Sequence, residues 1–179
     1  MNCINRITKV IDQISLWTGK AIAWLVIPMA GVLVYEVFVR TFFRPTLWAI
    51  DMAMIFYGFH FFLAGAMTLC LGKHIRTDFF YGKWSMRTQC WVDLVCYVFL
   101  FLPGMVLFVY LSWDFFYESW ELKENMMTTW RPPAYPYKLV IPVSGALILL
   151  QGISEVLKCV QTLRTGVDHR YRGEEREIT

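Results

Sequence analysis

The sequence lacks the residue groupings on which most enzymes depend. It has no glycine-rich phosphate-binding loop, no cluster of metal-ligating residues and no spacing typical of a catalytic triad. Its five cysteines include no C-x-x-C pair, which argues against a four-span thiol oxidase. Its three histidines are too few for two bis-histidine haems, and with only His60 inside an apolar run even one such haem is excluded. These absences favour a protein with neither a catalytic centre nor a cofactor.

Charged residues are also scarce, and four segments are almost free of them. The chain is 57% hydrophobic and 17% charged, whereas a soluble domain has roughly 25% charged residues. Residues 52–71, 94–113 and 139–154 contain no Asp, Glu, Lys or Arg, and residues 21–39 contain only Glu36. About 20 helical residues cross the hydrocarbon core of a membrane. The sequence therefore predicts an all-α membrane protein with four transmembrane helices, in one domain over residues 1–179, at about residues 20–40, 50–72, 91–113 and 137–158.

The distribution of Lys and Arg predicts the orientation of these helices. Twelve of them precede the first span, lie between the second and third spans or follow the fourth, and five lie on the opposite side. Cytoplasmic loops carry the excess of positive charge, so we expect both termini in the cytoplasm, with a basic tail at 159–179. Residues 1–18 and 75–87 combine apolar and basic residues in a pattern that predicts amphipathic helices on the cytoplasmic surface. Ordinary juxtamembrane segments are the alternative for both.

Few ionisable side chains fall inside the predicted spans. Glu36 and Arg40 are four residues apart and can pair on one face of the first helix. Asp51, at the start of the second helix, is close enough in sequence to reach Arg40 or Arg44. We expect a structural ion-pair cluster here, and the alternative is a proton or cation site of the kind found in small multidrug exporters. His60, near the middle of the second helix, is expected to hydrogen-bond a neighbouring helix.

Small residues mark the faces on which helices can approach closely in lipid. Two pairs of glycines lie seven residues apart: Gly58 and Gly65 in the second span, and Gly145 and Gly152 in the fourth. The helix that packs on each pair belongs either to this chain or to a partner. Gln151 and Glu155 share one face of the fourth helix and are expected to lie in a helix interface. Pro28 and Pro103 are expected to kink their helices or to free backbone carbonyls.

Three stretches of the chain, in this order, match the pattern of a known family. RTFFRPTLWAIDMA (40–53) is similar to an Arg-x-x-Phe, Trp and acid pattern that opens a second helix, with Asp51 where Glu is more usual. GAMTLCLGKHIRTDFFY (65–81) is similar to a Gly-Ala … Gly-x-His-x-x-x-Asp signature, in which Gly72, His74 and Asp78 match. WRPPAYPYKLVIPVSGALILLQG (130–152) resembles a proline-rich lead-in to a fourth helix. Together they resemble the small membrane subunit, the DctQ-like small permease, of tripartite ATP-independent periplasmic (TRAP) transporters.

The resemblance implies a function and two protein partners. In such systems a periplasmic binding protein captures a solute, often an organic acid, and a large M-type membrane subunit carries it inward on a sodium gradient. The small subunit packs beside the large one in the bacterial inner membrane as a scaffold, without ATP hydrolysis, and its other contact is the lipid bilayer. Nucleic acid is not an expected partner. A self-contained small exporter or channel and a four-helix assembly factor are the alternatives.

The resemblance also suggests roles for two groups of residues. Gly72 is expected to end the second helix, and His74 and Asp78 then lie in a structural cytoplasmic turn. Trp120 and Trp130, with Tyr135, lie in the long outer connection, next to several prolines. They are expected either to dock the binding protein or the large subunit, or to form an aromatic belt at the membrane interface.

Overall fold

The computed structural model describes residues 2–72 and 84–166, and the regular elements in these ranges are all helices. Four helical stretches among them are long and apolar enough to cross a membrane: Ile4–Phe42, Ala49–Cys70, Arg87–Glu121 and Tyr135–Thr165. This confirms the predicted all-α protein with four transmembrane helices. The first, third and fourth stretches have 39, 35 and 31 residues, so each is longer than the roughly 30 Å of hydrocarbon that it has to cross.

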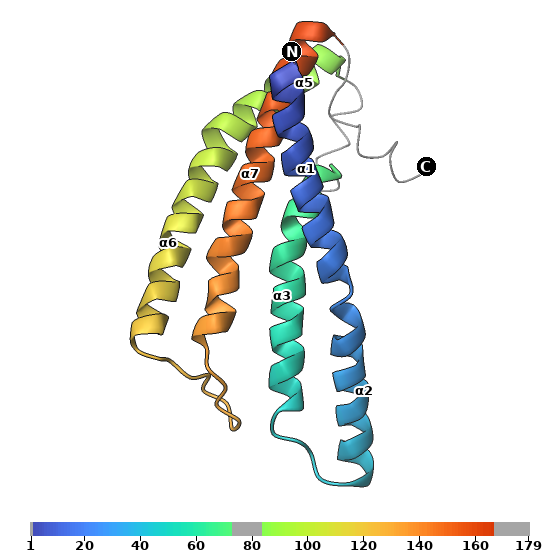
Figure 1. Ribbon diagram of the computed structural model, residues 1–179, viewed down its shortest axis with the longest axis vertical. Helices are drawn as coiled ribbons and strands as arrows, with labels where there is room; N and C mark the ends of the chain where they lie inside the picture. Colours follow the sequence, from blue (N-terminus) through green and yellow to red (C-terminus); the bar gives the residue numbers. More distant parts are fainter. Residues whose placement is uncertain (1, 73–83, 167–179) are drawn as a thin grey trace.

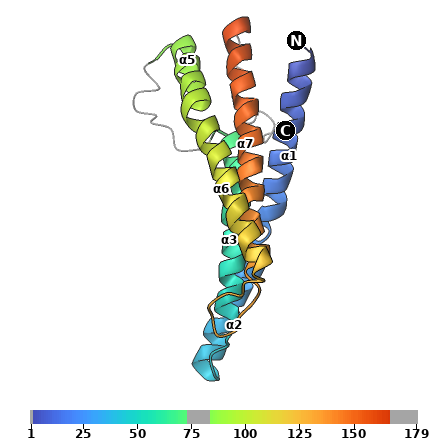
Figure 2. The ribbon, with the colours of Figure 1, turned by 90° about the vertical axis from the view of Figure 1, so that its left-hand side faces the viewer.

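The helices stand in a row with α7 (Tyr135–Thr165) and α3 (Ala49–Cys70) in the middle (Figure 1). α6 (Leu102–Glu121) packs on the side of α7 that faces away from α3, and α2 (Val26–Phe42) packs on α3. α1 (Asn2–Ala23) continues the line of α2 and contacts both α3 and α7, while α5 (Met86–Cys96) contacts α7. Seen from the side, α5, α7 and α1 spread apart at one end of the molecule (Figure 2).

The first residues of α1 and the last residues of α7 lie at the same end of the molecule, here called the terminal end (Figure 1). The connections 43–48 and 122–134 lie at the opposite end, here called the loop end. This arrangement agrees with an even number of spans. The cytoplasmic placement of the terminal end stays a prediction from the Lys and Arg distribution.

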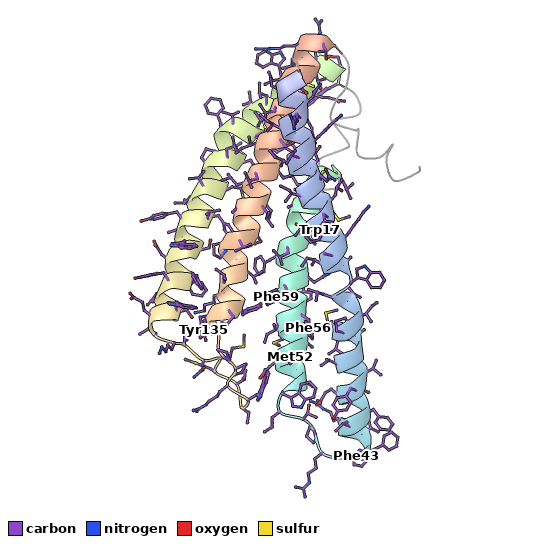
Figure 3. All side chains as sticks on the ribbon, in the orientation of Figure 1. Trp17, Phe43, Met52, Phe56, Phe59 and Tyr135 are labelled. Carbon is purple, nitrogen blue, oxygen red and sulfur yellow. The ribbon has the colours of Figure 1, made fainter. Side chains whose placement is uncertain are left out.

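The described helices bury polar side chains and expose apolar ones. The largest fully buried side chains include those of Gln151, Thr162, Ser15, Ser119, Ser144 and Ser154. Large apolar side chains project outward along the helices (Figure 3), and Trp17 and Phe99 are both 74% exposed. In water this distribution would be unfavourable. In lipid the acyl chains cover the apolar side chains, and polar groups have to find partners inside the protein.

α1 and α2 form one helix that is interrupted at Trp24 and Leu25. Pro28 has no N–H to offer the Trp24 carbonyl, and the Leu25 N–H donates to the Ile22 carbonyl, at 2.9 Å, in a tighter turn. His60 of α3 has its Nδ1 3.2 Å from the same Ile22 oxygen. Because a carbonyl only accepts, Nδ1 is the donor. His60 therefore fastens the interruption to α3, and the predicted hydrogen bond to a neighbouring helix is confirmed.

The third span also changes its helical geometry ahead of a proline. α5 leads into a π-helical turn, Tyr97–Phe101, in which the Leu102 N–H donates to the Tyr97 carbonyl five residues back. Pro103, which cannot donate, then stands in the first turn of α6, where a helix tolerates proline. Both prolines singled out in the sequence thus follow a break in regular α-helix.

Three further predictions from the sequence concern the end of α3, the beginning of α1 and the two segments predicted to lie on the cytoplasmic side. Gly72 ends α3 as predicted, with a φ of 66° that places it in the left-handed region. Residues 2–18 are helical, but they are the first part of α1 and pack along α7; their position at the membrane surface stays a prediction. Residues 75–83 of the second amphipathic segment and 167–179 of the basic tail lie outside the described residues.

Replacing His60 tests whether its hydrogen bond stabilises the interruption between α1 and α2. We expect His60→Leu to lower the free energy of unfolding in detergent micelles by about 1 kcal/mol, the size of an interhelical hydrogen bond in a membrane protein. His60→Asn keeps an N–H close to the Nδ1 position and should lose clearly less. Chemical unfolding followed by circular dichroism measures both variants. An equal loss in both would assign the effect to packing rather than to the hydrogen bond.

Candidate functional site

A buried polar network joins α1 to α7 near the terminal end. The Lys158 ammonium lies 2.9 Å from Asp12 Oδ1 and 2.7 Å from Glu155 Oε1. Gln151 Nε2 donates to the same two oxygens, at 3.0 Å and 3.1 Å respectively. The Ser154 hydroxyl adds a third donor to Asp12 Oδ1, at 3.0 Å. One cation and two neutral donors thus satisfy two carboxylates that come from different helices.

The α7 side of the network is buried, and the Asp12 side chain on α1 is 25% exposed. Glu155 is 3% exposed and Lys158 7% exposed, and Gln151 is fully buried. The Ser15 hydroxyl donates to Gln151 Oε1 at 2.7 Å, so both the oxygen and the nitrogen of the Gln151 amide form hydrogen bonds. Buried charges are tolerated only when they are paired and hydrogen-bonded. The arrangement therefore fits a structural tie between α1 and α7.

Sequence reasoning identified part of this network. It placed Gln151 and Glu155 in a helix interface, and both lie between α7 and α1. It missed Lys158 and Asp12. The available signal was the spacing of Gln151, Ser154, Glu155 and Lys158 along one face of α7, since a continuous polar stripe on a long helix indicates a buried polar interface or a water-facing surface.

A second polar cluster closes the connection between α2 and α3 at the loop end. Glu36 Oε1 accepts from Arg40 Nη2 at 3.1 Å and from Arg40 Nε at 3.3 Å, which confirms the predicted i, i+4 pair. Glu36 Oε2 accepts from both the backbone N–H and the hydroxyl of Thr46. Glu36 is buried while Arg40 is more than half exposed. Both oxygens of the Glu36 carboxylate therefore accept hydrogen bonds, one from Arg40 and the other from Thr46 in the connection. This fits the predicted structural ion pair better than the proton site of an exporter.

Asp51 forms no ion pair with Arg40 or Arg44 in the described structure. It is 7% exposed, on the buried side of α3, and its Oδ2 has no hydrogen-bond partner among the described residues. Arg40 does not pair with Asp51 because its guanidinium is paired with Glu36, one turn earlier in α2. Asp51 lies in the first turn of α3, where the helix dipole favours a negative charge.

Both pairs of glycines pack against helices of this same chain. A Cβ at Gly58, Gly65 or Gly152 would clash with Tyr137, Ile148 or Phe101, respectively. At Gly145 it would be in tight contact with Phe108 and Val109. The first pair brings α3 against α7, and the second brings α7 against α6 and the π-helical turn. The question of which helix packs on each pair is thereby answered for both.

At the loop end, residues 122–134 fold back on themselves. The Met126 N–H donates to the Pro132 carbonyl at 2.8 Å, and the Ala134 N–H donates to the Glu124 carbonyl at 2.8 Å. The Glu124 side chain accepts from the Ser119 hydroxyl at 2.8 Å and pairs with the Lys138 ammonium. These bonds connect the end of α6 to the start of α7 on both sides of the loop.

The aromatic residues of this loop divide into two groups. Trp120 packs edge-on against Tyr135, with 5.1 Å between ring centres, across the ends of α6 and α7. Trp130 lies near the tip of the loop and is exposed, next to the fully exposed Met127. The docking role expected for Trp120 and Trp130 stays a prediction. His74 and Asp78 lie outside the described residues.

The described clusters hold helices and a connection of this chain together. Among residues 2–72 and 84–166, no group of three or more His, Cys, Asp or Glu side chains could hold a metal ion. The ionisable groups of the Lys158 and Glu36 clusters are occupied by partners within the chain.

A comparison with protein families decides where this architecture belongs. The family described as "Tripartite ATP-independent periplasmic transporters, DctQ component" matches residues 29–162, well over half of the chain. The chain belongs to this family. As a DctQ component it is a small part of a multi-component membrane transporter, and the resemblance read from its three sequence stretches is confirmed. No individual curated protein matches it.

Removing the central cation of the buried network should strongly destabilise this DctQ component. Lys158→Met leaves Asp12 and Glu155 facing each other without a counter-charge, and we expect it to lower the free energy of unfolding by about 3 kcal/mol. Arg164→Met, on the exposed last turn of α7, is the matched control and should change it by less than about 0.5 kcal/mol. Chemical unfolding in micelles measures both. Equal stabilities would show that the network does not tie α1 to α7.

We expect the thermal stability of the protein to depend on pH through Glu124 at the loop end. The Lys138 ammonium and the Ser119 hydroxyl hold the pKa of Glu124 below its ordinary value of 4.5. Because folding lowers this pKa, the ionised Glu124 side chain stabilises the folded protein fully at pH values above the ordinary pKa of 4.5. This stabilisation is lost as the pH falls through the lower pKa of the folded state. Glu124→Gln should therefore lower the thermal midpoint at neutral pH, and the difference from the parent should shrink below about pH 4.5.

Thermal unfolding from about pH 3 to about pH 7 measures this dependence. The control repeats the Glu124→Gln substitution in a Lys138→Met background, where the main cause of the lowered pKa is absent. A difference that is constant with pH in the parent background would contradict the assigned role of Lys138.

Proposed function

We propose that this DctQ component is a non-catalytic scaffold that holds the large M-type membrane subunit of its transporter in place while that subunit carries a solute inward. The observation that supports the proposal most directly is the internal pairing of polar groups. The Lys158 cluster joins α1 to α7, and the Glu36 cluster holds the connection after α2 to that helix. His60 holds the interruption between α1 and α2 against α3. A bundle stabilised in this way is suited to staying rigid beside a moving partner.

The proposal includes the arrangement that the family name describes in outline. A periplasmic binding protein delivers the solute, which we expect to be an organic acid, and an ion gradient, with sodium as the expected ion, drives uptake across the bacterial inner membrane. The Lys and Arg distribution supports an orientation with both termini in the cytoplasm. In that orientation the loop end faces the periplasm, where the binding protein is located.

Purification of the tagged chain from its native membrane in mild detergent tests the scaffold. We expect a large polytopic carrier to be recovered with it at a ratio near one to one, and uptake of the solute to stop when the gene for this chain is deleted and to return when it is restored. Mass spectrometry and radiolabelled uptake measure the two outcomes. Recovery of the chain alone, as a dimer or tetramer with transport activity, would contradict the proposal in favour of a self-contained exporter.

A further inference from the structure

One face of α2 packs on α3, and the described chain leaves the other sides of the helix exposed. Toward α3 it turns Met29, Val32, Glu36 and Val39, which are its less exposed residues. On the opposite side lie exposed residues that recur at spacings of four and three: Ile27, Gly31, Val34, Phe38 and Thr41. This alternation is the pattern of a helix that packs along another helix. The second set of five residues is called the free seam of α2.

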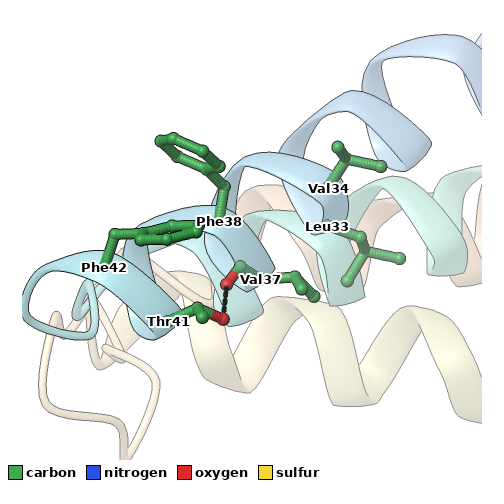
Figure 4. Close-up of a pocket in the computed structure, with 6 residues that line it drawn as sticks. All are labelled: Leu33, Val34, Val37, Phe38, Thr41 and Phe42. Atoms are coloured by element: carbon green, nitrogen blue, oxygen red, sulfur yellow. Dashed lines mark hydrogen bonds between the residues drawn. The ribbon is translucent and has the colours of Figure 1, made fainter.

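An open apolar hollow lies over part of the free seam. Val34, Val37, Phe38 and Thr41, at positions i, i+3, i+4 and i+7, surround it together with Leu33 and Phe42 (Figure 4), and its volume is about 430 Å³. Four residues at these positions form the hole that receives a knob from a facing helix. The Thr41 hydroxyl donates to the Val37 carbonyl at 2.8 Å, so its polar group is satisfied within α2.

The free seam also contains an unoccupied glycine. The glycines at 19, 58, 65, 145 and 152 each receive a large side chain from a neighbouring helix, whereas a Cβ at Gly31 or Gly104 would have nothing within 4 Å. Small residues in lipid-exposed helices mark where another helix comes close. The hollow on the third span, near Gly104 in the sequence, includes the Asp93 side chain in its lining. The hollow on α2 is lined by apolar side chains and Thr41, whose hydroxyl is already bonded, so it is the better match to an apolar facing helix. On α2 the open glycine and the hollow lie on the same side of the helix, one turn apart.

We propose that the free seam of α2 is where a transmembrane helix of the transporter's large subunit docks. This inference rests on the proposed function, since it names the face by which the scaffold holds its partner. α2 stands at the edge of the row of helices (Figure 1), so its outer side is open to a second protein in the membrane. The match to the DctQ family begins at Met29 and so includes most of α2 while excluding α1.

The charge at the end of the seam specifies the partner further. Arg44 lies two residues beyond the end of α2, is exposed and forms no ion pair among the described residues. A helix with a bulky apolar side chain opposite the hollow and an acidic residue near its loop-end boundary would be complementary both in shape and in charge. A second copy of this chain would instead place arginine beside arginine if its α2 ran parallel to the first.

Photo-crosslinking in the purified complex tests the face directly. Phe38 on the free seam and Phe99 in the π-helical turn are exposed phenylalanines, at 56% and 74%, on different helices. Each is replaced by benzoylphenylalanine, a larger photoreactive derivative of phenylalanine, whose added ring fits at positions that are already exposed. We expect illumination to join the large subunit to the chain that carries the probe at position 38, and not to the chain that carries it at position 99.

A pair of glycine variants tests the same face by affinity. Gly31→Leu and Gly104→Leu both place a side chain into open space, so both variants should fold, as circular dichroism and gel filtration can verify. We expect Gly31→Leu to reduce the recovery of the large subunit by about tenfold, because the added side chain blocks close approach of a facing helix. Gly104→Leu should leave that recovery unchanged.

The outcomes separate this inference from the proposed function. If the unsubstituted chain recovers no large subunit, the proposed function is wrong. If it recovers the large subunit but the adduct forms only from position 99, or Gly31→Leu binds as well as the parent, the docking face is wrong and the function stands. Adducts from position 38 to lipid alone, or to a second copy of this chain, would also overturn the docking face.

Discussion

The structure depends on one constraint, which is that apolar contacts between helices gain little in a solvent that is itself apolar. Helices in lipid associate through close packing at small residues and through hydrogen bonds between polar groups that have no other partner. The Lys158 network satisfies this constraint by joining α1 to α7. The same constraint explains why tryptophan and phenylalanine side chains lie outside while serine, glutamine and lysine lie inside.

α7 makes a different kind of contact with each of the other three spans. It meets α6 through Gly145 and Gly152, where side chains of the third span enter. It meets α3 through Tyr137 and Ile148, which fill the space above the two glycines of that helix. It meets α1 through the polar stripe that includes Lys158. Because each contact has its own shape or charge pattern, these contacts specify which helices lie beside α7, while α2 is placed by its packing on α3.

The same features bear on function. A bundle whose ionisable clusters are internally paired can keep its shape while a partner moves, which is what a DctQ component would need to do as a scaffold. The surfaces left for partners are then the outer faces of the row and the loop end. Among them, α2 combines an open apolar hollow with an open glycine, and Arg44 just beyond its end forms no ion pair among the described residues.

The sequence by itself determined the features that depend on local spacing. The charge-free runs located the four helices, Glu36 and Arg40 paired because they are one turn apart, Gly72 ended a helix, and three ordered stretches indicated the family. Only the tertiary structure decided which helix fills each glycine pair and that Asp12 reaches Lys158. Those contacts join segments that are far apart in the chain, and in lipid no amphipathic pattern shows in advance which apolar face meets protein and which meets acyl chains. Asp51 lacked its expected arginine for a related reason, because Arg40 had a nearer partner on its own helix.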